Sequence, residues 1–223
     1  MIRVSADFIF DARAGRFLQD HVLTLEDGKV LDLSKVDHLD SNVQIWAGIL
    51  CPGFVNTHCH LELSHMKGMI ESGTGLINFI SKVLELRAFP ESEILQKLKE
   101  ADEEMYSSGI VAVGDISNTV HTVSTKEESP IRYYNFIEYF DLMNTDLTRS
   151  TIEKYDKVYQ SHQGHKSRVP HAPYSVTQKL FDHLNKYNSS DQIISIHNQE
   201  TPAENQMFID GEGDFAKFYQ RLG

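Results

Sequence analysis

Residues 52–60 read PGFVNTHCH, an apolar run that ends in two histidines separated by a single residue. On an extended strand successive side chains point to opposite faces, so His58 and His60 share one face while Cys59 points to the other. One strand therefore offers two imidazoles to one metal ion. Downstream, residues 193–197 read IISIH, a second expected buried strand that ends in His197 and is followed closely by Glu200. Three histidines at the carboxyl ends of strands, with a carboxylate nearby, predict a zinc hydrolase site.

From residue 50 onward the pattern alternates between strands and helices, which is typical of parallel strands joined by crossover helices. Helices are expected through 76–84 and 94–105 and from near 148, 177 and 202, the last with a capping box at Thr201 and Glu204. The apolar stripes of these helices are interpreted as core. Strands are expected near 53–58, 110–116, 131–138, 167–171 and 192–197. The predicted fold class is thus α/β, a (β/α) TIM-type barrel over 51–223 that is incomplete, with about five of the eight strands.

Residues 1–50 are expected to form a separate small β domain, a β-sandwich-like layer. Residues 22–26 and 29–33 flank Asp27-Gly28, and this pair tolerates the positive φ angles of a two-residue type I′ hairpin turn. Short apolar stretches at 2–4, 8–10 and 43–46 are expected to extend that sheet.

Composition narrows the classes of function. The chain has 223 residues, is 40% hydrophobic and 24% charged, and carries a formal net charge of -11, with 32 acidic against 21 basic residues. This charge argues against nucleic-acid or anionic-membrane partners, whose phosphates need clustered Lys and Arg, and favours a small-molecule substrate. No apolar run is long enough to cross a bilayer and no signal peptide is recognised, so a cytoplasmic location is expected. The two cysteines, Cys51 and Cys59, are interpreted as buried, reduced thiols.

Other polar residues near the expected strand ends have a structural and a functional interpretation. His171 precedes Ala-Pro and serves either as a turn residue or as a substrate contact. Glu62 is either a substrate contact or an ordinary loop or surface carboxylate. Structural or solvated roles are the default for three further groups: the strand-end carboxylates Asp115 and Glu138, the loop pair His162 and His165, and the acidic helix face of Glu100, Asp102, Glu103 and Glu104.

Three stretches, PGFVNTHCHLELS, PHAPYS and ISIHNQET, carry a resemblance to a known family. They resemble the metal-dependent amidohydrolase superfamily, in the branch of cytosine, guanine and adenosine-type deaminases and chlorohydrolases. Within that branch the H-x-H-L-E-L-S continuation resembles aminofutalosine deaminases. The resemblance spans the whole chain but only about the first three fifths of a typical member of the family.

The resemblance implies roles for particular residues. His58, His60 and His197 match metal ligands, and Glu200 matches the glutamate that moves protons between the attacking water and the leaving amine. His171 matches a histidine that contacts substrate. The family also supplies a histidine and an aspartate from later strands, which this sequence does not contain. The 223 residues are therefore expected to be inactive by themselves.

The expected reaction is hydrolytic deamination of an aminopurine nucleoside-like compound, of the aminofutalosine or adenosine type. One divalent ion is expected, with zinc favoured and iron or manganese able to satisfy similar ligands. Two rivals stay open: hydrolysis of a ring amide or an aryl chloride by the same activated water, and a non-catalytic barrel fragment with a partial or empty metal site. The sequence does not fix the oligomeric state, and a homodimer stays open.

Overall fold

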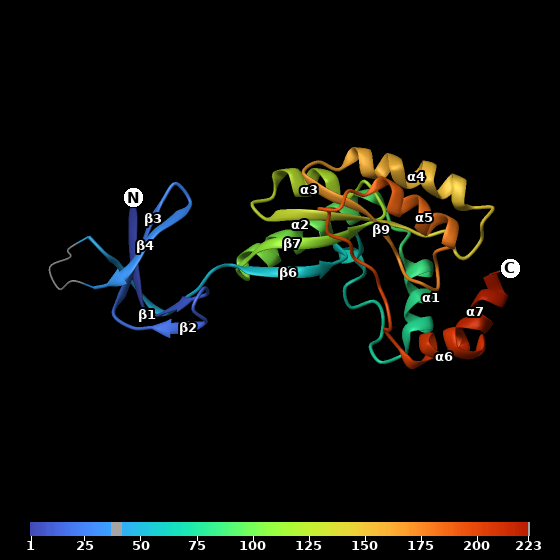
Figure 1. The fold of residues 1–223 in the computed structure, drawn as a ribbon, viewed down its shortest axis with the longest axis horizontal. Coiled ribbons are helices and arrows are strands. Elements are labelled where there is room, and N and C mark those ends of the chain that lie inside the picture. Colours follow the sequence, from blue (N-terminus) through green and yellow to red (C-terminus); the bar gives the residue numbers. More distant parts are fainter. Residues whose placement is uncertain (37–41, 223) are drawn as a thin grey trace. The chain divides into compact units, whose positions relative to one another are not determined.

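The structure is a computed structural model that describes residues 1–36 and 42–222. Contacts divide the chain into two compact units, Met1–Phe54 and Val55–Gly223, each with its own sheet (Figure 1). All of the predicted site residues belong to the second unit, whose architecture is α/β. Among the helices described in both units, none combines the length and apolar character required to cross a bilayer.

The first unit is one hydrogen-bonded sheet of five strands, β1 (Ile2–Asp11), β2 (Arg16–Leu18), β3 (His21–Glu26), β4 (Lys29–Lys35) and β5 (Gln44–Leu50). The predicted hairpin is confirmed, because Glu26 pairs with Lys29 and both turn residues, Asp27 and Gly28, have positive φ angles of 49° and 72°. The β-sandwich-like layer expected from the sequence is a single sheet here, in which β5 runs parallel to β1.

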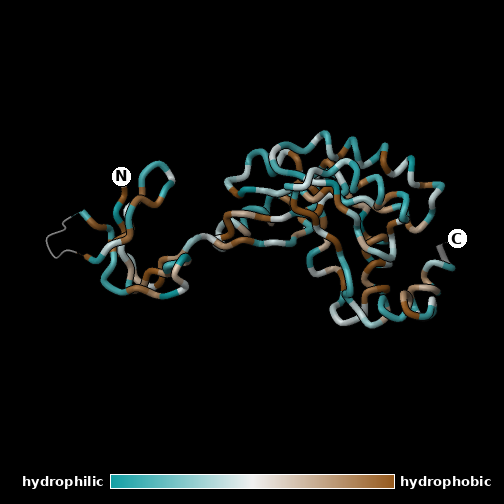
Figure 2. Tube along the Cα trace, viewed as in Figure 1, coloured by the Kyte–Doolittle hydropathy of each residue, from teal (hydrophilic) through white to brown (hydrophobic). Residues whose placement is uncertain are grey.

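The second unit is built on a four-stranded sheet in the order β6-β7-β8-β9. Its strands are β6 (Phe54–Cys59), β7 (Ile110–Ser117), β8 (Arg132–Tyr139) and β9 (His165–Pro170), close to four of the five predicted positions. The β7–β8 and β8–β9 pairs are parallel, so their carboxyl ends meet at one edge of the sheet. Figure 2 shows apolar residues along the central strands, and on β8 the apolar side chains of one face pack against helices.

Helices lie between the strands and after the last of them. In chain order they are α1 (Leu76–Leu86), α2 (Glu91–Ser107), α3 (Thr122–Glu128), α4 (Thr148–Ser161), α5 (Gln178–Tyr187), α6 (Pro202–Asp210) and α7 (Asp214–Leu222). Tyr155 of α4 and Leu180 of α5 pack on Ile137 and Tyr139 of β8, which point to the helix face of the sheet. Residues Phe136 and Glu138, on the alternate positions of β8, therefore face the other side.

The structure corrects two expected features and adds one helix. Residues 192–197 form no strand, because side chains hold this segment beside β9: Ser167 donates to Ile193 O at 2.7 Å and Gln192 donates to Lys166 O at 2.7 Å. No described strand pairs with its outer edge, and Ile193 is 59% exposed. Helix α3 was not predicted. The capping box is wrong, since Glu204 accepts a hydrogen bond from the backbone of Glu200 and the Thr201 side chain caps nothing.

Burial also differs from several expectations. Cys51 is exposed and Cys59 half-buried, although both thiols are free as expected. Asp102, expected on a solvated helix face, is buried, and it accepts hydrogen bonds from Ser129 at the end of α3 and from Tyr133 of β8. His162, expected in a solvated loop, is 1% exposed because its ring bonds to Val158 O and Thr122 Oγ1 in the core.

Candidate active site

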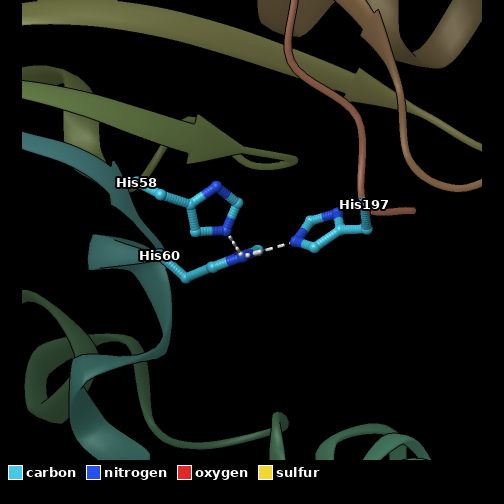
Figure 3. A group of neighbouring side chains, drawn as sticks. All are labelled: His58, His60 and His197. Carbon is cyan, nitrogen blue, oxygen red and sulfur yellow. Dashed lines mark hydrogen bonds between the residues drawn. The ribbon is translucent and has the colours of Figure 1, made fainter. Parts of the chain in front are cut away.

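Three histidines from distant parts of the sequence converge at the carboxyl edge of the sheet (Figure 3). His58 lies near the end of β6, His60 directly follows that strand, and His197 ends the irregular segment beside β9. Nε2 of His60 lies 3.1 Å from Nε2 of His58 and 3.2 Å from Nε2 of His197. The three ring nitrogens thus surround one point, although 137 residues separate His60 from His197.

The spacing of these nitrogens fits a shared metal ion. A tetrahedral zinc ion with bonds of ~2.0–2.1 Å to imidazole nitrogens holds its ligand atoms about 3.3–3.4 Å apart. The two Nε2–Nε2 distances of 3.1 and 3.2 Å come close to that value. A neutral imidazole has one ring nitrogen with a lone pair and no hydrogen. When three such nitrogens lie this close together, a cation at their centre can accept all three lone pairs. The residues present therefore fit a divalent ion.

The electrostatics of the site favour histidines that are free to act as ligands. Burial lowers the pKa of His60 to about 4, where the other two imidazoles also act against protonation. Burial and the neighbouring His197 lower the pKa of His58 as well. Both rings are therefore neutral at pH 7, which is the form that binds a metal.

A buried carboxylate, Glu138, lies behind His197. Its Oε1 is 3.2 Å from Nδ1 of His197, and the side chain is 3% exposed. Burial lowers the pKa of His197, but the contact with Glu138 outweighs burial and leaves that pKa raised. For Glu138, burial raises the pKa and the nearby histidines outweigh it, so the pKa falls and Glu138 is ionised at neutral pH. Glu138 thus places a negative charge directly behind one of the predicted ligands.

His171 belongs to both the turn and the site. Its Nδ1 lies 2.6 Å from Ser175 Oγ, which itself donates to Ala172 O at 3.2 Å, so the serine oxygen accepts from the ring. The ring lies 5.1 Å from that of His197, centroid to centroid, and lines a cavity. Burial lowers the pKa of His171, so its ring is neutral and its Nε2 carries a lone pair. The structural and the substrate-binding interpretations are therefore compatible, and substrate contact stays a prediction.

Glu200 lines the same cavity three residues after His197. The chain reaches it through Gln199, whose φ of 56° lies in the left-handed region, a conformation that non-glycine residues adopt at a cost. Tyr174 donates a hydrogen bond to Oε2 of Glu200 at 3.1 Å. The negative charge of Glu200 contributes to raising the pKa of His197, so the carboxylate and the imidazole act on each other. This arrangement suits a group that exchanges protons with a ligand beside the histidines.

Glu62 is a buried anchor. The surface-carboxylate interpretation is wrong, because the residue is 4% exposed. Its Oε2 accepts hydrogen bonds from the backbone N–H groups of Asn118 and Thr119 at 2.8 and 3.0 Å, which fixes the turn after β7. Burial raises the pKa of Glu62 to about 7 despite these bonds and the nearby Arg87. Direct substrate contact by Glu62 stays a prediction.

A cavity of about 490 Å³ opens onto the histidines. His60, His171, His197 and Glu200 lie at one part of its wall, and one face of α1 supplies apolar lining through Leu76, Phe79, Ile80, Val83 and Leu84. The expectation that this stripe of α1 is core is wrong, since Phe79 is 45% and Leu84 49% exposed. The helix turns its apolar side to an open cavity that can hold an apolar or aromatic ligand group.

Sequence reasoning missed the site roles of three residues. The sequence predicts a structural role for Glu138 and marks neither Asn118 nor Tyr174. A signal for Glu138 exists, since it alternates with Ile137 and Tyr139, which pack against the helices, and therefore points to the face that carries the histidines. Asn118 and Tyr174 sit in turns without a periodic pattern, so no local signal marks them.

Comparisons with known proteins agree with this geometry. The family model described as "Amidohydrolase family" matches residues 49–222. The chain is 26% identical over 188 residues to the aminodeoxyfutalosine deaminase of Nitratiruptor sp., covering 78% of this chain and 44% of that protein. It thus spans less than half the length of this relative.

Solved structures share the fold. A Helicobacter pylori aminofutalosine deaminase in complex with methylthio-coformycin has a TM-score of 0.84 at 21% identity, over 99% of this chain and 56% of that one. The atrazine chlorohydrolase TrzN of Arthrobacter aurescens, complexed with zinc, has a TM-score of 0.71 at 16% identity, over 99% of this chain and 58% of that one. At these identities the likeness shows the fold alone.

Proposed function

This chain belongs to the amidohydrolase family, and from that premise we propose that it supplies the first part of a metal-dependent hydrolytic deaminase. The convergence of the three Nε2 atoms of His58, His60 and His197 carries the proposal. The proposed substrate is an aminopurine nucleoside-like compound of the aminofutalosine or adenosine type. Its support is the identity with an aminodeoxyfutalosine deaminase and a cavity with a polar and an apolar part.

The chain's own residues would divide the work. His58, His60 and His197 would hold one divalent ion, for which zinc is proposed and iron or manganese are the alternatives. When bound, such an ion lowers the pKa of water from ~15.7 toward ~7 and so supplies hydroxide at neutral pH. Glu200 would carry protons from the attacking water to the ring nitrogen and then to the departing amine, which leaves as ammonia. A hydrogen bond from Tyr174 fixes one of the carboxylate oxygens of Glu200. His171 would contact the purine.

The parallel sheet with its alternating helices supports a further proposal, that this unit is the first part of a (β/α) barrel. Ligand residues at the carboxyl ends of neighbouring strands are where such barrels bind their substrates. A cytoplasmic location and a homodimer stay predictions.

The test measures turnover of each compound by the full natural protein loaded with zinc, as ammonia released from an amine, chloride released from a chlorinated triazine or ring opening of an amide. We expect turnover of adenosine or aminodeoxyfutalosine and none of a chlorinated triazine or a ring amide. Turnover of only the triazine or the amide would replace deamination by the rival hydrolysis. A zinc-loaded protein that turns over none of these compounds would contradict the proposal and favour the non-catalytic interpretation.

Glu200→Gln separates proton transfer from metal binding. The amide keeps the shape of the side chain but cannot donate and recover a proton, so turnover should fall by at least about 100-fold, the lower end of the usual contribution of general acid–base catalysis. Zinc content should not change. Glu212→Gln, an exposed glutamate outside the cavity, is the matched control and should keep full activity. Retained activity in Glu200→Gln would remove Glu200 from the mechanism.

A further inference from the structure

His197 is the one predicted ligand that no strand positions. His58 lies on β6 and His60 directly follows it, whereas residues 192–197 lack a backbone ladder and bond to the sheet mainly through side chains. One backbone hydrogen bond, from His197 N to His171 O at 2.9 Å, fixes the main chain. The direction of the imidazole ring must therefore be set by groups that touch the ring itself.

Two acceptors flank Nδ1 of this ring. The carbonyl oxygen of His171 lies 3.1 Å from Nδ1, and Oε1 of Glu138 lies 3.2 Å from it. A carbonyl oxygen carries no hydrogen, so the proton between these groups belongs to Nδ1. The lone pair of His197 is then on Nε2, the atom that lies 3.2 Å from Nε2 of His60. The tautomer that a metal ion needs is thus selected from behind the ring.

Glu138 is itself held in place. Nδ2 of Asn118 donates to Oε2 of Glu138 at 3.0 Å and to its backbone oxygen at 3.1 Å. The backbone of Asn118 is in turn bonded to the buried Glu62 at 2.8 Å. Oε1 of Glu138 receives no well-aligned hydrogen bond from any described residue, so it is a buried oxygen aimed at His197. This chain of contacts connects the turn after β7 to the end of β8 and to His197.

We propose that Glu138 is a positioning residue, which orients the ring of His197 and keeps its proton on Nδ1. The proposal rests on the proposed function, because it treats the three histidines as a metal site. This role requires a carboxylate, so an amide of the same shape should not fill it. In Glu138→Gln, the donor Asn118 requires the amide oxygen on its own side, so the amide N–H2 faces Nδ1 of His197. The N–H2 group of the glutamine and the Nδ1–H group of His197 are then two donors that face each other. This repulsion is relieved when the ring moves its proton to Nε2 or turns away.

The experiment measures the zinc affinity of the full natural protein by competition with a chromophoric chelator. Glu138→Gln should bind zinc about 10- to 100-fold more weakly, the usual effect of losing a partner behind a metal ligand. Glu138→Asp, which keeps the carboxylate, should recover part of that loss. Asp102→Asn is the matched control: it removes a buried carboxylate that binds Ser129 and Tyr133, so it should lower the unfolding midpoint and leave zinc affinity unchanged.

A second measurement reports the tautomer directly. Nitrogen-15 NMR of the zinc-free protein, recorded at a pH high enough that the ring of His197 is neutral, should show His197 protonated on Nδ1 in the wild type and increasingly on Nε2 in Glu138→Gln. A merely structural role would leave these shifts unchanged. If Glu138→Gln does not fold, Asn118→Ala frees the carboxylate and should weaken zinc binding several-fold.

The outcomes separate this role from the proposed function. Wild-type protein that binds no zinc overturns the proposed function and, with it, the role of Glu138. Wild-type protein that binds zinc no more tightly than folded Glu138→Gln, or than Asn118→Ala where Glu138→Gln does not fold, overturns only the role of Glu138. Unchanged nitrogen-15 shifts of His197 in folded Glu138→Gln have the same consequence.

Discussion

Replacing Gly114 by alanine should damage the sheet at the point where it carries the histidines. Gly114 lies in β7, and a Cβ atom there would lie 2.7 Å from the carbonyl oxygen of Thr57 and 2.8 Å from Cε2 of Phe136. Ordinary contacts of a Cβ atom begin near 3.4 Å, so both overlaps exceed half an ångström. Thr57 precedes His58 on β6, and its carbonyl moves only if β6 moves.

The expected cost follows from this overlap. Extra methyl groups forced into a packed interior destabilise proteins by about 1–3 kcal/mol. For a unit of this size, each kcal/mol lowers the melting temperature by about 2–4 °C, so a total fall of roughly 2–12 °C is expected. Because His58 and His60 move with β6, zinc affinity should fall as well.

Two further variants identify the contact that matters. Phe136 is 5% exposed and is a side chain, so Phe136→Leu relieves only one of the two overlaps. The double variant Gly114→Ala/Phe136→Leu should therefore regain little zinc affinity. Val111→Thr on the same strand is the control, since Val111 is 42% exposed and the change should stay within about 0.5 kcal/mol. A Gly114→Ala protein with wild-type melting temperature and zinc affinity would refute the close approach of β6 and β7.

Two other predictions concern the metal and the core. His58→Ala and His60→Ala should contain no zinc on elemental analysis, and their melting temperature should no longer respond to a chelator. Wild-type protein in free zinc at about 100 times the Kd should lose ~2.7 kcal/mol of its free energy of unfolding when the zinc is removed. Unchanged zinc content in the two variants would contradict the ligand assignment. His162 should make the protein acid-sensitive, because burial lowers its pKa from 6.5 to about 4 and the unfolded chain therefore binds the proton first. Stability falls as pH drops through this window, by roughly 3 kcal/mol for the single group. Urea unfolding at pH 7 and pH 4.5 should show this loss in the wild type and a smaller loss in His162→Gln; equal losses would disprove it.

Much of the fold could be predicted because its signals are local. The Asp27-Gly28 turn, the four strands of the second unit and most of its helices follow from turn chemistry and from apolar spacing along the chain. The failures share a physical cause. A run such as residues 193–196 is apolar enough for a buried strand, but a strand also needs a partner at its edge, and the run itself does not encode that partner. Burial of Asp102 and His162 likewise depends on donors and acceptors from distant segments.

The same division applies to the site. The sequence alone determined that His58 and His60 share one side of a strand end, because alternation along a strand is a property of the backbone. Only the tertiary structure decided that His197 meets them, that Glu138 lies behind its ring and that Glu62 is buried below the turn after β7. These relations depend on which strands are neighbours and in what register, and no local pattern of residues specifies a distance between atoms 137 positions apart.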